Sequence, residues 1–398
     1  MLMSGDSAPN GSLSGSARPH SASPRGRLER WRIAYTARRN AIFGSNGFQY
    51  WCARLPLIRR VAKTRATQMM DHIVGFTYSQ VLKAVVEVEL LDLLANGPIT
   101  AAEVAHYTKL SEDAALTLLR AARALDLAEE VVADGWMLGQ QGAVLVADEG
   151  TQAMIMHHRL LYRDLLDPLE LLRKDRKEPS ELSRYWSYAG ALHGAAERGQ
   201  ETEDYSRLMA ASQRYVADQV LAAFRFTGVE SLLDVGGGHG AFVRRVGEAY
   251  PKMRLGLLDL PEVATSARAP LASAIGTERV TCHPGNFFED TIPTGYELVS
   301  LVRILHDHDD APAAALLRNI HASLSPGQRL LIAEPMARIP GAEPMGEAFF
   351  GFYLWAMGSG RARSPEEIHR MLREAGFSKS RLIAGPQPVI ASMIVATA

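Results

Sequence analysis

The second half of the chain alternates short apolar runs with segments of helical periodicity, and this alternation limits the possible folds more than any other feature of the sequence. Apolar runs of strand length begin at residues 231, 254, 279, 296 and 328, each followed by a helix-like segment. This pattern is typical of a parallel sheet with helices on both faces. Residues 381–398 instead predict two strands joined without a helix, hence a terminal antiparallel hairpin. We expect an α/β fold with a doubly wound, mostly parallel, seven-stranded sheet.

A glycine-rich turn follows the first of these runs. In SLLDVGGGHGAF, residues 231–242, the run ends in Asp234, and Gly236, Gly238 and Ala241 follow at the spacing of a dinucleotide site. An NAD-dependent oxidoreductase is therefore one interpretation. A carboxylate beside the glycines suits a ligand with an ammonium group better than it suits a pyrophosphate. S-adenosylmethionine is such a ligand, because it has an amino acid tail and no phosphate.

The following strands supply further candidates for the cofactor site. Asp259 lies at the distance where a ribose-binding acid is expected in either cofactor class. In HPGNFFED, Asn286 can hydrogen-bond an adenine edge and Phe287 can cover its face, although core packing explains Phe287 equally well. The prediction for this site also includes Gly240, Leu260 and Arg303.

The first half of the chain predicts a helical region that ends in a hairpin. Residues 71–97 carry apolar side chains at helical spacing, and Gly97-Pro98 ends this pattern. Thr100 and Glu103 form a capping box for the next helix, and Asp134-Gly135 marks the turn of a hairpin. Helices followed by a hairpin are typical of a winged-helix domain.

A winged helix makes DNA binding an alternative function. The would-be recognition helix offers only Arg120 and Arg123 as cations, and the chain has a formal net charge of −1. Both features argue against a polyanionic partner, so we expect no nucleic-acid partner. A winged-helix DNA binder or a catalytically silent regulator is the competing interpretation outside enzymes.

A basic and aromatic segment precedes the helical region. Between Arg25 and Arg65 the chain carries 11 arginines and lysines against the single acid Glu29. The interleaved aromatic residues are Trp31, Tyr35, Phe43, Phe48, Tyr50 and Trp51. Cations mixed with amphipathic rings suit an anionic membrane surface. A pair of helices packed on the body of the protein with a solvated basic face explains the segment equally well.

The C-terminal half resembles a known enzyme family. LVRILHDHDD, residues 301–310, is similar to the signature L-K-x-I-L-H-D-W-x-D of small-molecule O-methyltransferases of the caffeate and acetylserotonin type. LLDVGGGHG, LLDLPEV, GNFF and LLIAEPM occur in matching order. The helical region resembles the dimerisation domain of that family. Three further segments resemble the bacterial carotenoid hydroxyl O-methyltransferases of the spheroidene pathway. They are GFTYSQVLKAVVEVELLDLL, FGFYLWAMGSGRARSPEEIHRMLREAGF and FQYWCARLPLIRRVAKTRA.

The resemblance implies a homodimeric S-adenosylmethionine-dependent O-methyltransferase that acts on a small hydrophobic hydroxylated substrate, here an acyclic carotenoid. Residues 1–28 are rich in Ser, Gly, Pro and Arg, and this composition predicts a disordered extension, for which an organelle transit peptide is the alternative. We expect two domains after it. Residues 29–215 would form a helical, winged-helix-like dimerisation and substrate-pocket domain. Residues 216–398 would form a Rossmann-like class I methyltransferase domain. Tetrapyrrole, polyketide and phenol hydroxyls are the alternative acceptors.

The resemblance also implies the catalytic residues. His306 corresponds to the general base, and Glu334 of IAEPM to the acid that orients its imidazole. The chemistry agrees, because in-line methyl transfer needs a positioned oxygen lone pair and a free imidazole can take the hydroxyl proton. The second glutamate of the family, in the pattern K-E-R-T, falls on Ala362. A metal site built from His306, His308 and Asp310 lacks a fixed ligand geometry in one short loop, so we expect no metal.

We predict the substrate pocket around GEAFFGFYLWAMGSG, residues 346–360. This segment has too many aromatic residues for one helical face, so some of them face a ligand, with pure core or dimer packing as the alternative. The predicted pocket residues are His157, Tyr162, Trp186, Phe349, Phe352, Tyr353 and Trp355.

The expected location is the cytoplasm. Cys52 and Cys282 lie far apart outside any metal-type spacing, which is typical of reduced thiols. The sequence has no run of 18 apolar residues and no compact apolar stretch of a secretory signal at its start. Residues 25–65 would allow peripheral contact with the inner, photosynthetic membrane.

Overall fold

The computed structural model describes residues 26–54, 56–173, 176, 178–185, 213–388 and 390–398. Residue contacts divide the chain into two units, Met1–Ser79 and Gln80–Ala398, and each unit is described by itself. The predicted extension over residues 1–28 lies outside the described residues except for its last three, and Trp186 lies outside them as well. No helix in the described ranges is long and apolar enough to cross a membrane.

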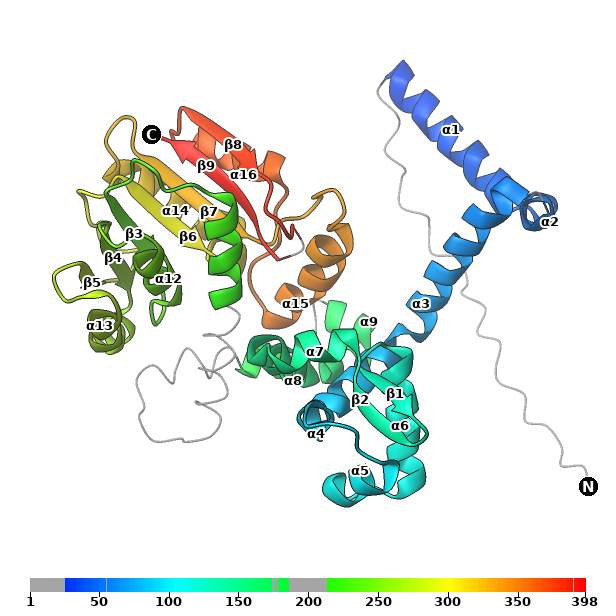
Figure 1. The fold of residues 1–398 in the computed structure, drawn as a ribbon. Coiled ribbons are helices and arrows are strands. Elements are labelled where there is room, and N and C mark those ends of the chain that lie inside the picture. Colours follow the sequence, from blue (N-terminus) through cyan, green and yellow to red (C-terminus); the bar gives the residue numbers. More distant parts are fainter. Residues whose placement is uncertain (1–25, 55, 174–175, 177, 186–212, 389) are drawn as a thin grey trace, which may run out of the picture. The chain divides into compact units, whose positions relative to one another are not determined.

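The first unit consists of helices. They are α1 (Arg27–Phe43), α2 (Asn46–Arg54) and the larger part of α3 (Pro56–Glu87), which continues into the second unit (Figure 1). Helix α1 has no buried residue. Trp31 and Tyr35 stack on each other along α1 at a centroid distance of 5.5 Å, and the side chains of both are exposed. The rings of this unit therefore lie beside its cations without forming a core.

The second unit begins with the predicted helical region. Its elements are α4 (Leu90–Ala95), α5 (Ala101–Thr108), α6 (Glu112–Ala124), β1 (Ala128–Val132), β2 (Gly135–Leu138), α7 (Gln140–Val146), α8 (Glu149–Asp164) and α9 (Pro168–Leu172). The capping box of Thr100 and Glu103 is confirmed, and so is the antiparallel hairpin β1–β2. Trp136 of β2 is 1% exposed and packs in the core of this region.

The prediction of one helical run over residues 71–97 was wrong at one point. Helix α3 ends at Glu87, and Glu89 adopts the left-handed backbone with φ 54°, so that α4 begins afresh at Leu90. The break turns the chain so that Leu90, Leu91 and Leu94 are buried. Their burial offsets the cost of a left-handed glutamate.

The seven-stranded sheet has the predicted architecture. Its strands are β3 (Ser231–Val235), β4 (Arg254–Asp259), β5 (Val280–Pro284), β6 (Leu298–Val302), β7 (Arg329–Glu334), β8 (Lys379–Ile383) and β9 (Ser392–Thr397). The order is β5-β4-β3-β6-β7-β9-β8, with β3 to β7 parallel and β9 antiparallel to both β7 and β8. The strand order reverses between β3 and β6, which is where doubly wound sheets bind ligands.

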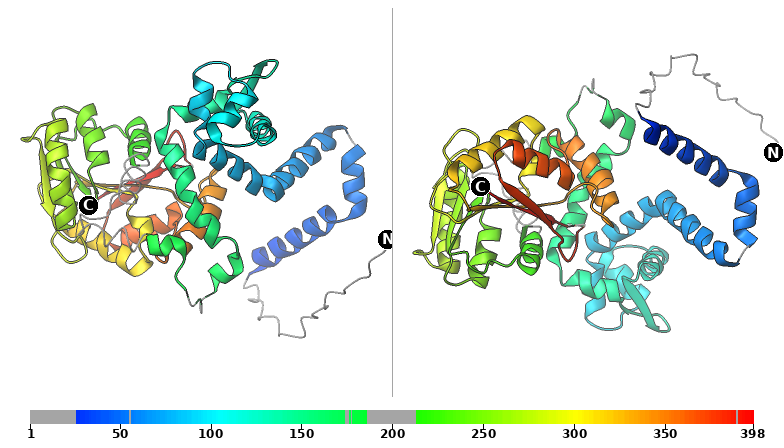
Figure 2. Two further views of the ribbon diagram at one scale, coloured as in Figure 1. Left: turned by 90° about the horizontal axis from the view of Figure 1, so that it is seen from below. Right: turned by 90° about the horizontal axis from the view of Figure 1, so that it is seen from above.

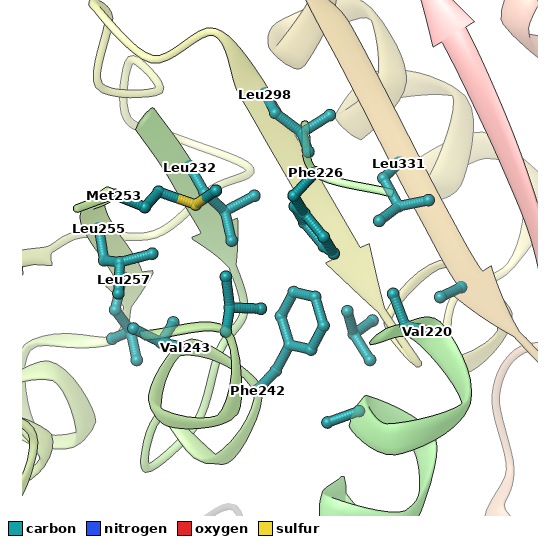
Figure 3. Close-up of a cluster of buried hydrophobic side chains, with 14 of the residues drawn as sticks. Val220, Phe226, Leu232, Phe242, Val243, Met253, Leu255, Leu257, Leu298 and Leu331 are labelled. Atoms are coloured by element: carbon teal, nitrogen blue, oxygen red, sulfur yellow. The ribbon is translucent and has the colours of Figure 1, made fainter. Parts of the chain in front are cut away.

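Helices cover both faces of the sheet (Figure 1; Figure 2). One face packs against residues 213–223, α12 (Ala241–Ala249) and α13 (Pro261–Ile275), and the other packs against α14 (Asp310–Ser323) and α16 (Pro365–Glu374). Figure 3 shows Leu232 of β3 on the first face with Phe242 of α12. Leu233 belongs to the core on the other face, as strand alternation requires.

Candidate active site

The glycine turn lies at the carboxyl end of β3 and leads into α12. Gly236, Gly238 and Gly240 all have positive φ, which glycine adopts without strain. A Cβ at Gly236 would lie 2.6 Å from Cδ1 of Ile304, so a side chain there would force Ile304 to shift. A Cβ at Gly238 would meet nothing within 4 Å, so the backbone at this position faces open space. The turn is thus fixed on one side and accessible on the other.

Asp234 lies beneath this turn and is 1% exposed. Its Oδ1 accepts a 2.6 Å hydrogen bond from the Ser300 hydroxyl of β6, and its Oδ2 lies 2.8 Å from where a Cβ of Gly237 would be. Burial raises the pKa of Asp234 to about 7, although the Ser300 hydrogen bond lowers it. The carboxylate therefore supports the turn from below, and its contact with a ligand ammonium group stays a prediction.

Asp259, at the end of β4, holds the same turn from the side. Its Oδ2 accepts a 2.7 Å hydrogen bond from the backbone N–H of Gly238, and its Oδ1 accepts one of 2.8 Å from the N–H of Leu260. Leu260 precedes α13 and is 43% exposed. Asp259 is half-buried, so its oxygens are within reach of a ligand seated on Gly238.

The predicted adenine-binding pair lies after β5. The ring of Phe287 would come within 3.4 Å of a Cβ at Gly236, which places it against the glycine turn. It also contacts Phe288 and the imidazole of His308, with centroid distances of 4.7 and 5.9 Å. The amide oxygen of Asn286 accepts a hydrogen bond from the backbone N–H of Phe288, which orients its side chain. The contact with His308 was not predicted.

His306 lies in a short 3-10 helix, Leu305–Asp307, after β6, and is 2% exposed. Its Nε2 is 3.0 Å from Oδ1 of Asp307, and its Nδ1 is 3.8 Å from Oε2 of Glu334. Burial lowers the pKa of His306, but the two carboxylates outweigh this effect, so the pKa is raised. Burial raises the pKa of Glu334, and this effect outweighs the lowering of that pKa by the neighbouring imidazole of His306.

Glu334 holds the backbone of His306 by a hydrogen bond, whereas it acts on the imidazole through its charge alone. Its Oε2 accepts a 3.1 Å hydrogen bond from the backbone N–H of His306. Its Oε1 and the Nδ1 of His306 are both buried without a hydrogen-bond partner within the described part of the chain. Buried polar atoms of this kind are costly and cluster at functional sites. The predicted pair is therefore brought together.

A loop after α15 clamps the segment that carries His306, and the sequence analysis did not predict it. Arg363 is 0% exposed and donates to the backbone carbonyls of Leu305 and His308, each at 2.7 Å. It also donates to Oδ1 of Asp310. A Cβ at Gly360, with φ 79°, would lie 2.1 Å from the His306 carbonyl oxygen. The sequence holds no local signal for this clamp, because Arg363 and Asp310 are 53 residues apart in the chain.

Arg303 lies at the end of β6 with the left-handed φ of 57°. Its backbone N–H donates to the carbonyl of Ala333 at 2.8 Å, which joins β6 to β7 beyond their paired residues. Its positive charge lowers the pKa values of both His157 and His306, although it is a minor cause in each case. The charge of Arg303 therefore acts on both His157 and the proposed base.

The predicted substrate pocket joins α8 to α15 (Phe350–Met357), which follows a π-helical turn, Pro344–Phe349. His157 Nε2 is hydrogen-bonded to the Tyr353 hydroxyl at 2.9 Å, and burial lowers the pKa of His157 to about 4. Phe349 and Phe352 pack on the same cluster. Trp355 Nε1 donates to the carbonyl of Leu171 at 2.7 Å, which makes this ring part of the packing between helices.

Tyr162 occupies a less central position on α8. Its ring contacts His158, which in turn contacts Phe349. A cavity of about 560 Å³ opens on the same helix and was not predicted. Its lining residues are Val86, Glu89, Asp92, Glu149, Gln152, Ala153, Met156, His157, Arg159, Leu160 and Tyr185. Among the residues that the structure describes, no group of His, Cys, Asp and Glu forms a metal site.

Comparisons with known proteins cover nearly the whole chain. Residues 70–148 match the family model of the O-methyltransferase dimerisation domain, and residues 162–378 match that of the O-methyltransferase domain. The demethylspheroidene O-methyltransferase of Cereibacter sphaeroides is 41% identical over 89% of this chain and 92% of its own length. That of Rhodobacter capsulatus is 41% identical over 92% of this chain and 88% of its own length.

Solved structures give the same fold. The 8-amino-8-demethylriboflavin dimethyltransferase of Streptomyces davawensis is 28% identical, with a TM-score of 0.65 over 83% of this chain and 98% of its own. Human N-acetylserotonin methyltransferase in complex with S-adenosylmethionine is 24% identical, with a TM-score of 0.66 over 84% of this chain and 97% of its own.

Proposed function

This chain belongs to the S-adenosylmethionine-dependent O-methyltransferases, and from that premise we propose that it methylates a hydroxyl group of an acyclic carotenoid. The observation that carries the proposal is the 41% identity, over about nine-tenths of the chain, with two enzymes named demethylspheroidene O-methyltransferase. The aromatic cluster around Tyr353 supports it, because an apolar acceptor needs apolar surroundings. We also propose a homodimer, which the match to the dimerisation domain supports.

The residues at the glycine turn fit the cofactor. Gly238 leaves its backbone open, Asp259 offers carboxylate oxygens beside it, and Phe287 covers Gly236. In our proposal the ribose hydroxyls bind Asp259, and the adenine lies at Asn286 and Phe287. S-adenosylmethionine supplies a methyl group on a cationic sulfur, and its transfer to the acceptor oxygen releases a thioether and a proton.

His306 is the proposed acceptor of that proton. An aliphatic alcohol is too weak an acid to ionise before the transfer, so proton removal has to accompany formation of the oxygen–carbon bond. In the structure Nε2 of His306 faces Asp307 at 3.0 Å, so the acceptor hydroxyl has to replace Asp307 as the partner of Nε2. Glu334 then stabilises the imidazolium from the Nδ1 side.

We further propose that the first unit docks on an anionic membrane surface, where a carotenoid is dissolved. Its exposed rings include Trp31, Tyr50 and Trp51, and Arg54 lies 3.5 Å from the ring centroid of Tyr50. Rings and cations placed together in this way match the interface between lipid chains and anionic headgroups.

The acceptor is identified by mass spectrometry of methyl transfer from labelled S-adenosylmethionine. Detergent-dispersed hydroxyneurosporene, chlorophyllide and catechol are offered in parallel to the purified protein. We expect label on the carotenoid alone, and its loss in His306→Ala with cofactor binding retained. Label on chlorophyllide or catechol instead would overturn the proposed acceptor and leave the O-methyltransferase activity in place.

A further inference from the structure

We propose that the cavity on α8 holds the apolar chain of the acceptor, and that its rim carboxylates exclude acceptors that carry a carboxylate. The inference deepens the proposed function and rests on it, because it takes the acceptor to be a hydroxyl on an extended apolar skeleton. The specificity-determining residues that it assigns are Glu89, Asp92 and Glu149. None of them belongs to the predicted pocket around α15.

The cavity is connected to the proposed base by a series of ring contacts. His157 lines the cavity and contacts Tyr353, with a centroid distance of 6.1 Å. Tyr353 contacts Phe350 at 6.2 Å, and Phe350 contacts the imidazole of His306 at 5.8 Å. The cavity and the proposed base therefore lie at the two ends of one cluster of packed rings.

The size of the cavity and the apolar part of its wall suit part of a long apolar molecule. Val86, Ala153, Met156 and Leu160 line it, and His157 is held neutral at pH 7 because burial lowers its pKa to about 4. A volume of about 560 Å³ lies within the range of small-molecule sites, roughly 300 to 1,000 Å³. The methionine supplies a flexible and polarisable contact.

The rim gives the cavity its charge selectivity. Glu89, Asp92 and Glu149 are exposed and form no ion pair with any described residue. Among the described lining residues Arg159 is the only arginine or lysine, so the rim has a net negative charge. The left-handed backbone of Glu89 fixes the break between α3 and α4 that places two of these acids on the rim.

A neutral polyene passes this rim without an electrostatic cost, whereas a carboxylate is repelled by every rim acid. Unlike an apolar contact, this discrimination is weakened by salt, because the rim is open to solvent. Acceptors with propionate or benzoate groups are therefore disfavoured, and neutral hydroxylated chains are favoured. The rim thereby separates acceptors by charge at some distance from the reacting oxygen.

Retinol and retinoate test this selectivity, because they share a polyene and differ in a hydroxyl against a carboxylate. Binding to the full-length protein is measured by quenching of tryptophan fluorescence at low salt. In Glu89→Gln/Asp92→Asn/Glu149→Gln we expect retinoate affinity to rise on the order of tenfold while retinol affinity is unchanged. The control, Glu112→Gln/Asp113→Asn/Glu129→Gln, removes the same charge from exposed positions of the same region that do not line the cavity.

The inference is supported if only the rim variant gains affinity for retinoate and if added salt narrows the gap between the two ligands in the unmodified protein. An equal gain in the control variant, or an unchanged retinoate affinity in a folded rim variant that still binds cofactor, overturns it. The binding readout does not depend on methyl transfer. A failed carotenoid assay with intact charge selectivity would therefore overturn the proposed acceptor alone.

Discussion

His306 has a carboxylate at each ring nitrogen, and this arrangement determines its proton affinity. Asp307 at Nε2 and Glu334 at Nδ1 outweigh the burial of the ring, so the pKa of His306 is raised. A general base has to be unprotonated, and its activity therefore rises with pH through its pKa. The two acids therefore lower activity at low pH, because they keep the imidazole protonated there, but they also orient it.

Asp307→Asn tests this balance. The amide keeps a polar group beside Nε2 but removes the charge that raises the pKa of His306 in the free enzyme, so the acid limb of the pH profile of kcat/KM moves to lower pH. His306→Ala, by comparison, loses on the order of 10²- to 10⁴-fold in kcat at every pH. An acid limb that stays in place in Asp307→Asn, measured with labelled cofactor at limiting acceptor, would show that Asp307 does not control the base.

Asp234 predicts a pH dependence of stability. Because burial raises its pKa to about 7, the folded state binds a proton that the unfolded state releases near its ordinary value of 3.8. Stability from this group is therefore lost as pH rises through that window. Asp234→Asn, measured by urea unfolding, should exceed the unmodified protein in stability at about pH 8 by up to about 4 kcal/mol, with little difference at about pH 3.

The same variant tests the predicted role of Asp234 at the cofactor. If its charge faces the ammonium group, S-adenosylmethionine binds more weakly to Asp234→Asn even though the protein is more stable. Equal affinity, measured by calorimetry, would leave Asp234 as a support of the glycine turn through Ser300. A lower stability of the variant at high pH would contradict the raised pKa of the buried Asp234 carboxyl group.

At the scale of elements, the strands were predictable because of where they lie. Every residue of β3 and of β6 is buried, and a parallel sheet covered on both faces needs such continuous apolar runs. The break at Glu89 was not predictable, because the apolar positions on both sides of it keep their helical spacing. The clamp was not predictable either, since Arg363 and Asp310 are 53 residues apart in the chain.

The candidate site also contains features that the sequence predicts and features that it does not. The pairing of His306 with Glu334 follows from the order of two adjacent strands, so the motifs were sufficient to predict it. The contact of Nε2 with Asp307 depends on side-chain rotamers within one 3-10 turn, which no spacing rule determines. The cavity joins α8 to the end of α3, and that packing has no local signature.

Gly360→Ala tests the clamp between two loops. A Cβ at this position would lie 2.1 Å from the His306 carbonyl and 2.5 Å from the carbonyl carbon of Asp307, on a backbone with φ 79°. We expect a displaced base and a loss of kcat of about 100-fold, in keeping with a shift of about 1 Å at a reacting centre. Cofactor affinity, set at the glycine turn, stays within about twofold.

Gly351→Ala is the matched control. Gly351 lies in α15, where a Cβ would meet nothing within 4 Å, and alanine in a helix adds about 0.5 to 1 kcal/mol of stability. Activity of this variant should be unchanged, as measured by the same methyl-transfer assay. Full activity in Gly360→Ala would mean that the clamp does not position the segment that carries His306.

At the scale of the whole molecule, the chain combines a nearly neutral total with one strongly basic segment. The first unit holds exposed rings and cations that no core within it requires, whereas the second unit has its own cores on both faces of the sheet. A balanced total limits non-specific binding to polyanions, and the local excess of charge directs binding to one surface. The proposed membrane contact depends on this concentration of exposed cations and rings in the first unit.

Arg30→Gln/Arg32→Gln/Arg38→Gln tests that contact. Each cation contributes about 1 kcal/mol at an anionic membrane surface, so the variant should lose on the order of 100-fold in affinity for phosphatidylglycerol vesicles. The control Lys252→Gln/Arg318→Gln/Lys379→Gln removes the same charge from exposed positions of the catalytic domain. Methyl transfer to detergent-dispersed acceptor should be unchanged in both variants, because neither touches the glycine turn or His306. Equal losses of vesicle binding in the two variants, measured by co-sedimentation, would assign the binding to net charge and remove the first unit as the docking element.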